Sequence, residues 1–328
     1  MTPFDYHRAT SVDDAIRLVA QPGAMFLGGG TNLLDLAKGG VVQPRLLIDV
    51  SRLPLAEIAA MPDGGLRIGA GVRNSDAAAH ALVRQGYPLL AQALLAGASP
   101  QLRNMATVGG NLLQRTRCAY FCETAFEHCN KRMPGSGCGA LDGINGNHAI
   151  LGASRACIAT HPSDMCVALA ALRARVRVRS ARGERAIALA DFHRLPGDAP
   201  QRDTTLADGE LVLGVELPPP VFADHAHYLK VRDRASYAFA LVSVAAALEL
   251  RDGLVHDAAL ALGGVAHKPW RVAAAEAALV GQPLSAAAIA AAADAALQGA
   301  APASQNAFKV ALAQRAIVRA LQVAAGVA

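Results

Sequence analysis

The sequence predicts an α+β protein of two domains, and three observations lead to this prediction. Its 328 residues exceed the usual size of one domain. The first hundred residues alternate short apolar runs with stretches of helical spacing, as βαβ units do. Three consecutive prolines at 218–220 precede a region that ends in alanine-rich helices. We therefore expect a first domain over residues 1–221 and a second over residues 222–328.

The N-terminal elements follow from local patterns. Ser11 and Asp14 resemble a capping box ahead of apolar residues at helical spacing, so they predict the start of a helix. The apolar run 24–27 predicts a strand, and the spacing over 33–37 predicts the next helix. Further along, the sequence predicts buried strands at 46–50 and 66–70 and an Ala/Leu-rich helix over 77–97.

Residues 118–157 interrupt this alternation. They are rich in Gly, Asn, Cys and Pro and have almost no apolar period. A loop of this length inside a compact domain is usually functional. Beyond it, Ser163 is placed to cap a helix, and the pattern predicts strands near 174–180, 186–189 and 211–217.

The second domain contains one ambiguous segment. The apolar run from Ala238 to Leu250 suits either a helix or a strand, whereas 257–262 predicts a strand. Ser285 is an N-cap for a helix over 286–297. The leucine spacing and the late Lys and Arg residues favour packed helices over low-complexity sequence.

Composition excludes intrinsic disorder, because 53% of the residues are hydrophobic and only 17% are charged. Two explanations of the low charge stay open. Partner subunits cover part of the surface, since a monomer usually needs more charge to stay soluble, or the alanine content reflects a GC-rich genome.

Charge and hydropathy patterns limit the kinds of partner. The net charge is +5 without a Lys/Arg-rich tract, so we expect no nucleic acid partner. No apolar run approaches the roughly 20 residues of a membrane-spanning helix, and we expect no membrane insertion. The N-terminal residues lack an export-signal pattern, so export would depend on a partner. Alternating arginines predict a solvated strand face rather than a patch for an acidic partner: Arg173, Arg175, Arg177 and Arg179.

Two glycine-rich segments are candidate ligand loops. The segment 26–32, FLGGGTN, takes a strand into a helix start, where backbone N–H groups bind anions. It matches neither a GxGxxG fingerprint nor a Walker A loop, and a structural tight turn would explain it equally well. A second segment, 103–111 (RNMATVGGN), favours the ligand interpretation, since two such loops suit a diphosphate.

All six cysteines fall between residues 118 and 166, which predicts a metal or iron–sulfur site rather than a disulfide framework. Most of their spacings are too long for a CxxC zinc knuckle, yet a four-cysteine zinc site stays open on chemistry alone. Pro134, Gly135 and Gly137 would let the loop wrap a cluster and offer it backbone N–H groups. The nearby histidines are weaker candidate ligands: His128, His148 and His161.

The motifs together resemble a known family. GGGTNLLDL and QLRNMATVGGN resemble the FAD-binding subunits of molybdenum hydroxylases, the xanthine dehydrogenase and carbon monoxide dehydrogenase medium-subunit group. The resemblance extends over essentially the whole chain. RTRC, CNKR, GSGC and ACIATHPSD look like the FAD subunit of periplasmic aldehyde oxidoreductases, in which an inserted loop carries a [4Fe–4S] cluster. This resemblance implies a two-subdomain FAD-binding domain of the PCMH type with the inserted loop at 118–157, followed by a small α+β domain.

The resemblance also implies the site residues. Lys230 and Tyr237 would approach the flavin from the C-terminal domain, and no residue of this chain is assigned a catalytic role. One departure is that many members have an Asp soon after the GGN segment, whereas here Asp164 follows the loop. FAD would be bound by Phe26, Leu27, Gly28, Gly29, Gly30, Thr31, Asn32, Leu33, Thr107, Gly110, Asn111, Asp164 and Lys230. The cluster would be bound by Cys118, Cys129, Cys138 and Cys157, whereas Cys122 and Cys166 would not be ligands.

The function implied is that of an electron-transfer subunit in a heterotrimer. An aldehyde would be oxidised at a molybdenum cofactor on a large subunit, and electrons would pass through a small [2Fe–2S] subunit to FAD and an external acceptor. Whether the [4Fe–4S] cluster relays electrons stays open. Co-export with a signal-bearing partner would place the chain in the periplasm, and otherwise it would be cytoplasmic.

Three other functions stay open: a stand-alone flavin oxidoreductase, a medium subunit of a hydroxylase for heteroaromatic substrates, and a non-catalytic binding protein with a structural metal loop. The sequence has no Ser–His–Asp signature or paired carboxylates set for hydrolysis. Trp270, the single tryptophan, is expected to be a packing or interface anchor rather than a catalytic group.

Overall fold

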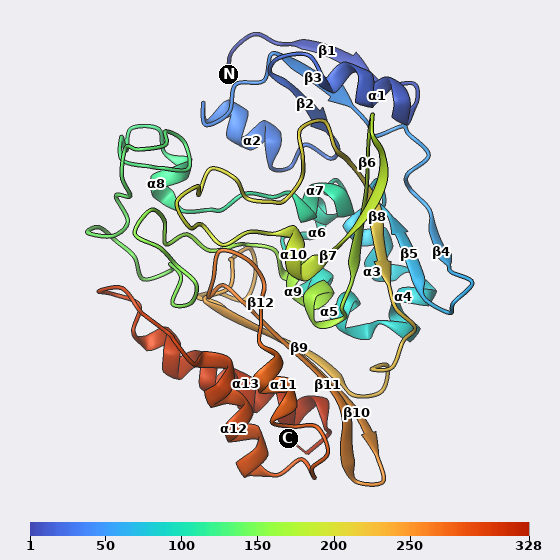
Figure 1. Ribbon diagram of the computed structural model, residues 1–328, viewed down its shortest axis with the longest axis vertical. Coiled ribbons are helices and arrows are strands. Elements are labelled where there is room, and N and C mark those ends of the chain that lie inside the picture. Colours follow the sequence, from blue (N-terminus) through green and yellow to red (C-terminus); the bar gives the residue numbers. More distant parts are fainter. Residues whose placement is uncertain (328) are drawn as a thin grey trace.

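The computed structural model describes residues 1–327, whose strands form three sheets (Figure 1). A parallel sheet in the order β1-β3-β2 belongs to an N-terminal subdomain: β1 (Asp5–Arg8), β2 (Ala24–Leu27) and β3 (Leu46–Asp49). An antiparallel sheet in the order β4-β5-β8-β6-β7 forms a second subdomain: β4 (Ile58–Ala60), β5 (Leu66–Gly69), β6 (Arg175–Ser180), β7 (Gly183–Ala188) and β8 (Leu211–Leu217). The C-terminal sheet has the order β12-β11-β10-β9: β9 (Ala226–Val231), β10 (Val242–Arg251), β11 (Leu254–Gly263) and β12 (Trp270–Arg271). The predicted α+β fold with a two-subdomain first domain is confirmed.

The N-terminal subdomain contains the predicted strands and helices. Helix α1 (Val12–Val19) begins after Ser11, whose hydroxyl accepts a hydrogen bond from Asp14 N (3.0 Å). In a capping box the Asp14 carboxylate would accept a hydrogen bond from Ser11 N. Here it accepts one from Thr10 N instead (3.0 Å). Strand β2 runs into the glycine segment, and α2 (Leu33–Lys38) follows it directly.

The single helix predicted over 77–97 is wrong, because three short helices occupy this region: α3 (Asn74–Ala79), α4 (Ala81–Gly86) and α5 (Pro88–Ala96). His80 has an extended backbone with ψ 135°, which ends α3. Pro88 lacks the N–H that a helix interior needs, so it begins α5 instead. The other short helices of the first domain are α6 (Pro100–Arg103), α7 (Val108–Leu112), α8 (Ala119–Cys122) and α10 (Leu189–Phe192).

The alternating arginines form a solvated strand face on β6, as predicted. Arg177 pairs with Glu216 (3.0 Å) and with Glu184, so this face is neutralised within the chain. Arg173 lies before the strand, in a left-handed conformation with φ 57°. The valines that alternate with these arginines are buried in the core of the subdomain.

The C-terminal sheet is covered on both faces. Ala245 and Ala247 of β10 pack into the core of the first domain, which includes α5 and α9 (Asp164–Ala171). Val244 and Leu248 face the core formed with the helices on the other side. Because both faces are buried, β10 has an almost uninterrupted apolar sequence, and the ambiguous segment is a strand. These helices are α11 (Ala273–Ala277), α12 (Ala286–Leu297), which Ser285 caps as predicted, and α13 (Phe308–Ala324).

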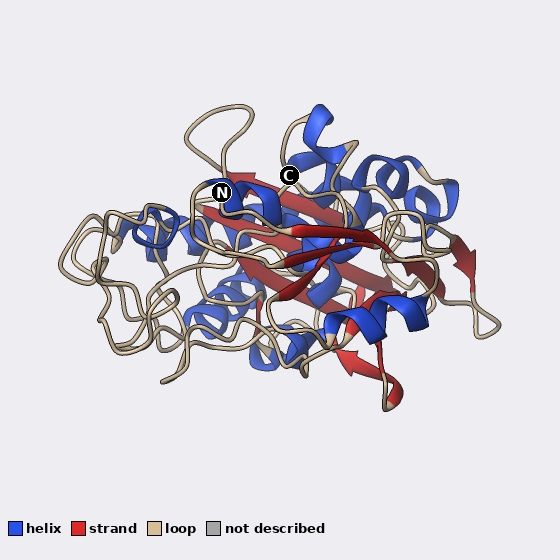
Figure 2. Ribbon diagram, turned by 90° about the horizontal axis from the view of Figure 1, so that it is seen from above, coloured by secondary structure: helices blue, strands red, loops and turns tan. Residues whose placement is uncertain are grey.

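Residues 118–157 project from one side of the molecule (Figure 2) and contain α8 as their only helix within the described chain. The end of this loop is joined to the C-terminal domain. Ile150 packs into the core of that domain, and its N–H donates to Val265 O (2.9 Å). Asn145 is fully buried and exchanges backbone-to-side-chain hydrogen bonds with Gln305 (2.9 and 3.3 Å). No described helix has both the length and the apolar character needed to cross a membrane.

Candidate cofactor-binding site

The two predicted glycine segments lie against each other. A Cβ added at Gly29 would fall 1.9 Å from the carbonyl oxygen of Met105, so this position accepts no side chain without displacing backbone. At Gly28 the nearest atom to an added Cβ would be the Thr107 hydroxyl oxygen, at 3.1 Å. Thr107 also caps α7, where its hydroxyl accepts a hydrogen bond from Gly110 N (3.1 Å). Glycine at position 29 is therefore required for the two segments to meet.

A cavity of about 350 Å³ opens beside these segments. Leu27 does not line it, and neither does Asn111, whose side-chain oxygen instead accepts a hydrogen bond from the Ser163 hydroxyl (2.7 Å). That bond links the second glycine segment to the start of α9. The predicted FAD-binding residues that line the cavity are Phe26, Gly28, Gly29, Gly30, Thr31, Asn32, Leu33, Thr107 and Gly110.

Asn32 offers an unused hydrogen-bond donor beside this cavity. Its side-chain oxygen accepts a hydrogen bond from Arg115 N (3.0 Å), whereas its Nδ2 is buried without a partner among residues 1–327. An unpaired buried amide costs about 1–3 kcal/mol, which a ligand oxygen would offset. With the backbone N–H groups of the glycine segment, this donor suits an anionic group rich in oxygen. The residues present thus fit the diphosphate of FAD.

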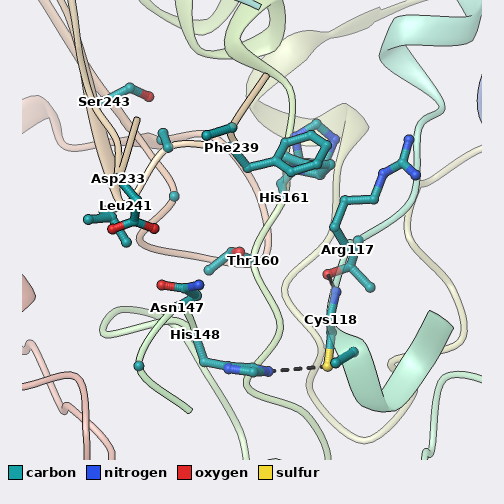
Figure 3. Close-up of a pocket in the computed structure, with 18 of the residues that line it drawn as sticks. Arg117, Cys118, Asn147, His148, Thr160, His161, Asp233, Phe239, Leu241 and Ser243 are labelled. Carbon is teal, nitrogen blue, oxygen red and sulfur yellow. Dashed lines mark hydrogen bonds between the residues drawn. The ribbon is translucent and has the colours of Figure 1, made fainter. Parts of the chain in front are cut away.

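A second cavity of about 620 Å³ lies next to the first, since Arg115 lines one and Thr116 lines the other. Three parts of the chain meet at this cavity (Figure 3). Cys118 and His148 come from the 118–157 loop, and Asp164 stands at the start of α9. Asp233 and Phe239 come from the C-terminal domain. Adjacent cavities of this kind suit an extended cofactor with two chemically different ends.

Asp164 is held by two side chains of β9. Its Oδ2 accepts a hydrogen bond from Lys230 Nζ (2.8 Å), and its Oδ1 accepts one from Tyr228 OH (2.7 Å). Burial and the Asp164 charge raise the pKa of Tyr228 well above its usual value, so the phenol stays a donor. Tyr228 was not among the predicted site residues, although its place two residues before Lys230 puts both side chains on one face of β9.

Lys230 and Tyr237 lie in different surroundings. Lys230 sits behind Asp164 and also donates to Ala96 O (3.1 Å), and it does not line the cavity. The Tyr237 residue is 60% exposed and has a left-handed backbone with φ 53°. Phe239, two residues further on, lines the cavity instead. The stretch therefore reaches the cavity, but through Phe239 rather than Tyr237.

The four cysteines predicted as cluster ligands converge. Cys129 and Cys138 pair in a short antiparallel bridge. Burial, with a smaller effect from the neighbouring thiols of Cys157 and Cys129, raises the pKa of Cys118 to about 12. Burial likewise raises the pKa of Cys157 to about 11, and Cys138 and Cys129 add to it. The raised pKa values keep these thiols protonated, so a metal centre would bind by replacing their protons. The only described ligand group compact enough for a single metal ion lies elsewhere, at Cys166, so these four cysteines suit the larger span of an iron–sulfur cluster better than a zinc ion.

The glycines at the tip of the loop have a different role from the one predicted. Gly135 and Gly137 both have positive φ, at 88° and 97°. Their N–H groups donate to the side-chain oxygen of Asn130 (3.0 and 2.9 Å), so they are not free to donate to cluster sulfurs. Asn130 thus fixes the turn that brings Cys138 beside Cys129.

The remaining cysteines have distinct surroundings. Cys122 lies near Cys129, and its Sγ faces Thr116 O at 3.8 Å. Cys166 is fully buried, and its sulfur and one nitrogen each of His161 and His193 lie within 4.8 Å of one another. These residue types could hold a single soft metal ion. In each ring one nitrogen is engaged, since His193 Nε2 contacts Leu112 O (2.9 Å) and His161 Nδ1 accepts from Ser163 N (3.4 Å). The other nitrogen of each ring is buried without a partner among the described residues.

Two family models match the chain. The FAD binding domain in molybdopterin dehydrogenase matches residues 2–220, and the CO dehydrogenase flavoprotein C-terminal domain matches residues 227–324. The first model ends at residue 220 and the second begins at residue 227.

Curated relatives and solved structures agree with these models. The chain is 52% identical to the aldehyde oxidoreductase FAD-binding subunit PaoB of Escherichia coli (strain K12), over 98% of each chain. It is 29% identical to the glyceraldehyde dehydrogenase medium chain of Sulfolobus acidocaldarius, over 86% of this chain and 83% of that one. Carbon monoxide dehydrogenase from Hydrogenophaga pseudoflava superposes with a TM-score of 0.77 at 27% identity, covering 99% of each chain. Quinoline 2-oxidoreductase from Pseudomonas putida 86 gives 0.76 at 26% identity, covering 99% of this chain and 98% of that one.

Proposed function

Because the chain belongs to the family of FAD-binding subunits of molybdopterin dehydrogenases, we propose that it is the electron-transfer subunit of a molybdenum-dependent aldehyde oxidoreductase. It would carry FAD and a [4Fe–4S] cluster, and it would assemble with a large molybdenum-cofactor subunit and a small [2Fe–2S] subunit. Electrons from these partners would leave through this chain to an external acceptor. The aldehyde as substrate class is supported by the near full-length likeness to an aldehyde oxidoreductase subunit.

The observation that carries the electron-transfer proposal is the cavity shared by Cys118 and Asp164. It brings a thiol of the cysteine loop and a buried carboxylate of the predicted flavin site to one cavity. FAD supplies the chemistry this position needs, because it exchanges electrons singly or in pairs. Asp164 would accept hydrogen bonds from hydroxyl groups of the cofactor, and Lys230 keeps that carboxylate oriented and neutralised.

The remaining residues have binding roles. The backbone from Gly28 to Gly30 and the Asn32 amide would hold the diphosphate. Cys118, Cys129, Cys138 and Cys157 would hold the cluster, within a loop whose end is packed in the C-terminal domain. No substrate-activating group is assigned to this chain, so aldehyde chemistry belongs to the large subunit.

The test is anaerobic reduction of the purified three-subunit complex, in which the flavin absorbance measures the extent of reduction. We expect an aldehyde to bleach the flavin in the complex and not in this chain alone. A heteroaromatic compound such as quinoline serves as the second substrate. Bleaching by quinoline but not by aldehydes would contradict the substrate class. Aldehyde turnover by the isolated chain would contradict the role as a subunit.

We propose that the chain reaches the periplasm bound to a partner that carries the export signal. The support is the resemblance of its motifs to those of periplasmic aldehyde oxidoreductases. Fractionation of cells that express all three subunits should place this chain in the periplasm. Removal of the partner's signal should return it to the cytoplasm, and export of this chain without partners would contradict the proposal.

A further inference from the structure

His148 contacts one of the four converging cysteines directly. Its Nε2 lies 3.2 Å from Cys118 Sγ, which is the contact drawn as a dashed line in Figure 3. The residue is only 7% exposed, and it lines the 620 Å³ cavity together with Cys118. The contact is therefore partly shielded from bulk water, and this shielding strengthens the electrostatic effect of a hydrogen bond.

The position of His148 is set by the C-terminal domain. Its carbonyl oxygen accepts hydrogen bonds from Lys309 Nζ (2.8 Å) and Asn306 Nδ2 (3.1 Å), and both donors are fully buried. Its own N–H donates to Asn145 O (3.0 Å). Three buried hydrogen bonds thus hold the backbone of a residue in an otherwise irregular loop. Such anchoring is characteristic of a residue whose side chain must keep one orientation.

The chemistry of the two groups determines the direction of the hydrogen bond. A cysteine bound to iron is a thiolate, which accepts hydrogen bonds and has no proton to donate. A neutral imidazole has one N–H, so a contact at 3.2 Å stabilises the site when Nε2 carries the hydrogen. His148 Nδ1 is then a bare acceptor, in agreement with its having no partner among the described residues.

We propose that His148 donates an N–H···S hydrogen bond to the Cys118 thiolate and thereby raises the reduction potential of the cluster. This inference rests on the proposed [4Fe–4S] centre. Hydrogen bonds to ligand sulfurs withdraw electron density from the metal, and they stabilise the reduced cluster more than the oxidised one. His148 acts through Cys118, so it is a positioning and tuning residue rather than a ligand.

The test is a redox titration of the complete three-subunit complex, with the reduced cluster followed by electron paramagnetic resonance. We expect His148→Leu to keep its full iron content and to shift the cluster to a more negative potential. His148→Gln keeps an N–H donor of similar reach and should restore most of the potential. The control is His128→Leu, since the exposed His128 ring contacts Ser136 O (2.8 Å) in the same loop. The [2Fe–2S] potentials of the small subunit provide an internal reference.

The outcomes distinguish a tuning role of His148 from a purely structural role and from the absence of a cluster. An unchanged potential in His148→Leu with full iron would overturn the tuning role, and so would an equal shift in His148→Leu and His148→Gln. Loss of iron in His148→Leu would overturn it too, because a mere hydrogen-bond donor is not required for cluster assembly. If the wild-type complex has no iron beyond that of the small subunit, the proposed [4Fe–4S] function fails instead. The two failures are therefore distinguishable.

Discussion

The Lys230 ammonium group lies 2.8 Å from the Asp164 carboxylate, and both side chains are less than 10% exposed. The pair joins β9 of the C-terminal domain to the first residue of α9 in the first domain. Tyr228 donates to the other carboxylate oxygen, so both oxygens of Asp164 are held by β9 at the wall of the 620 Å³ cavity.

This pair predicts a strong penalty when one partner is removed. Lys230→Met should lower the free energy of unfolding by about 3–5 kcal/mol, because it leaves a buried carboxylate without its cation. Combining it with Asp164→Asn should recover much of that loss. Urea-induced unfolding of the purified chain measures both. The exposed Lys38→Met is the control and should change stability by no more than about 0.5 kcal/mol. Additive effects in the double variant would contradict the coupling.

Gly29→Ala should lose bound flavin. The added methyl group would fall 1.9 Å from Met105 O, so the two glycine segments must separate. Gly39→Ala in the same region is the control, since its Cβ would make only an ordinary contact of 3.6 Å. Flavin absorbance per protein after purification gives the result. Full flavin content in Gly29→Ala would disprove the assignment of the two glycine segments as the flavin-binding site.

The converging cysteines make a prediction about iron. Serine in place of Cys118, Cys129, Cys138 or Cys157 should remove the iron of this chain, because metal binding and folding of the loop are coupled. Cys122→Ser and Cys166→Ser should retain it. Iron analysis of the purified complex, corrected for the small subunit, compares the six variants. A loss in Cys122→Ser together with retention in Cys118→Ser would reverse the assignment.

Two buried histidines predict sensitivity to acid. Burial lowers the pKa of both His193 and His267 to about 4. Between pH 6.5 and pH 4 the unfolded chain therefore binds more protons than the folded chain, so stability falls as the pH falls. Each histidine contributes up to about 3 kcal/mol of this loss, at about 1.4 kcal/mol per pKa unit.

Unfolding by urea at pH 7 and pH 5 measures this effect. His193→Gln keeps a side-chain donor for Leu112 O and should reduce the difference between the two pH values. Gln201→Ala is the control, because exposed Gln201 has no titratable group and its replacement should leave the difference unchanged. Equal pH dependence in wild type and His193→Gln would contradict the prediction.

Local patterns predicted the elements that depend on neighbouring residues in the chain. The caps at Ser11, Ser163 and Ser285, and the passage from β2 through the glycines to α2, follow from side chains within a few residues. The break at His80 was missed because the apolar spacing continues across it. The strand assignment of β10 required knowledge that both faces of its sheet are covered.

The residues of the site also fall into those that local sequence patterns predicted and those that they did not. Its glycine and cysteine motifs were visible as sequence, whereas the partners of Asp164 lie more than sixty residues away. Tyr228 had no motif of its own. Likewise, the group formed by Cys166, His161 and His193 arises only when α9 and the segment after α10 come together. Long-range contacts of this kind depend on the fold and leave no local pattern.

The hydrogen bonds of Asn145 and His148 with residues 304–309 have a consequence for biogenesis. On the ribosome, the four cysteines proposed as cluster ligands emerge well over a hundred residues before α13. Until α13 docks, the end of the loop lacks the hydrogen bonds that Asn306 and Lys309 donate to it, and we expect the thiols to be more accessible to an iron donor. Docking of α13 then seals the loop against the C-terminal domain. A [4Fe–4S] cluster at these cysteines, as proposed, would therefore take up its iron between synthesis of Cys157 and docking of α13.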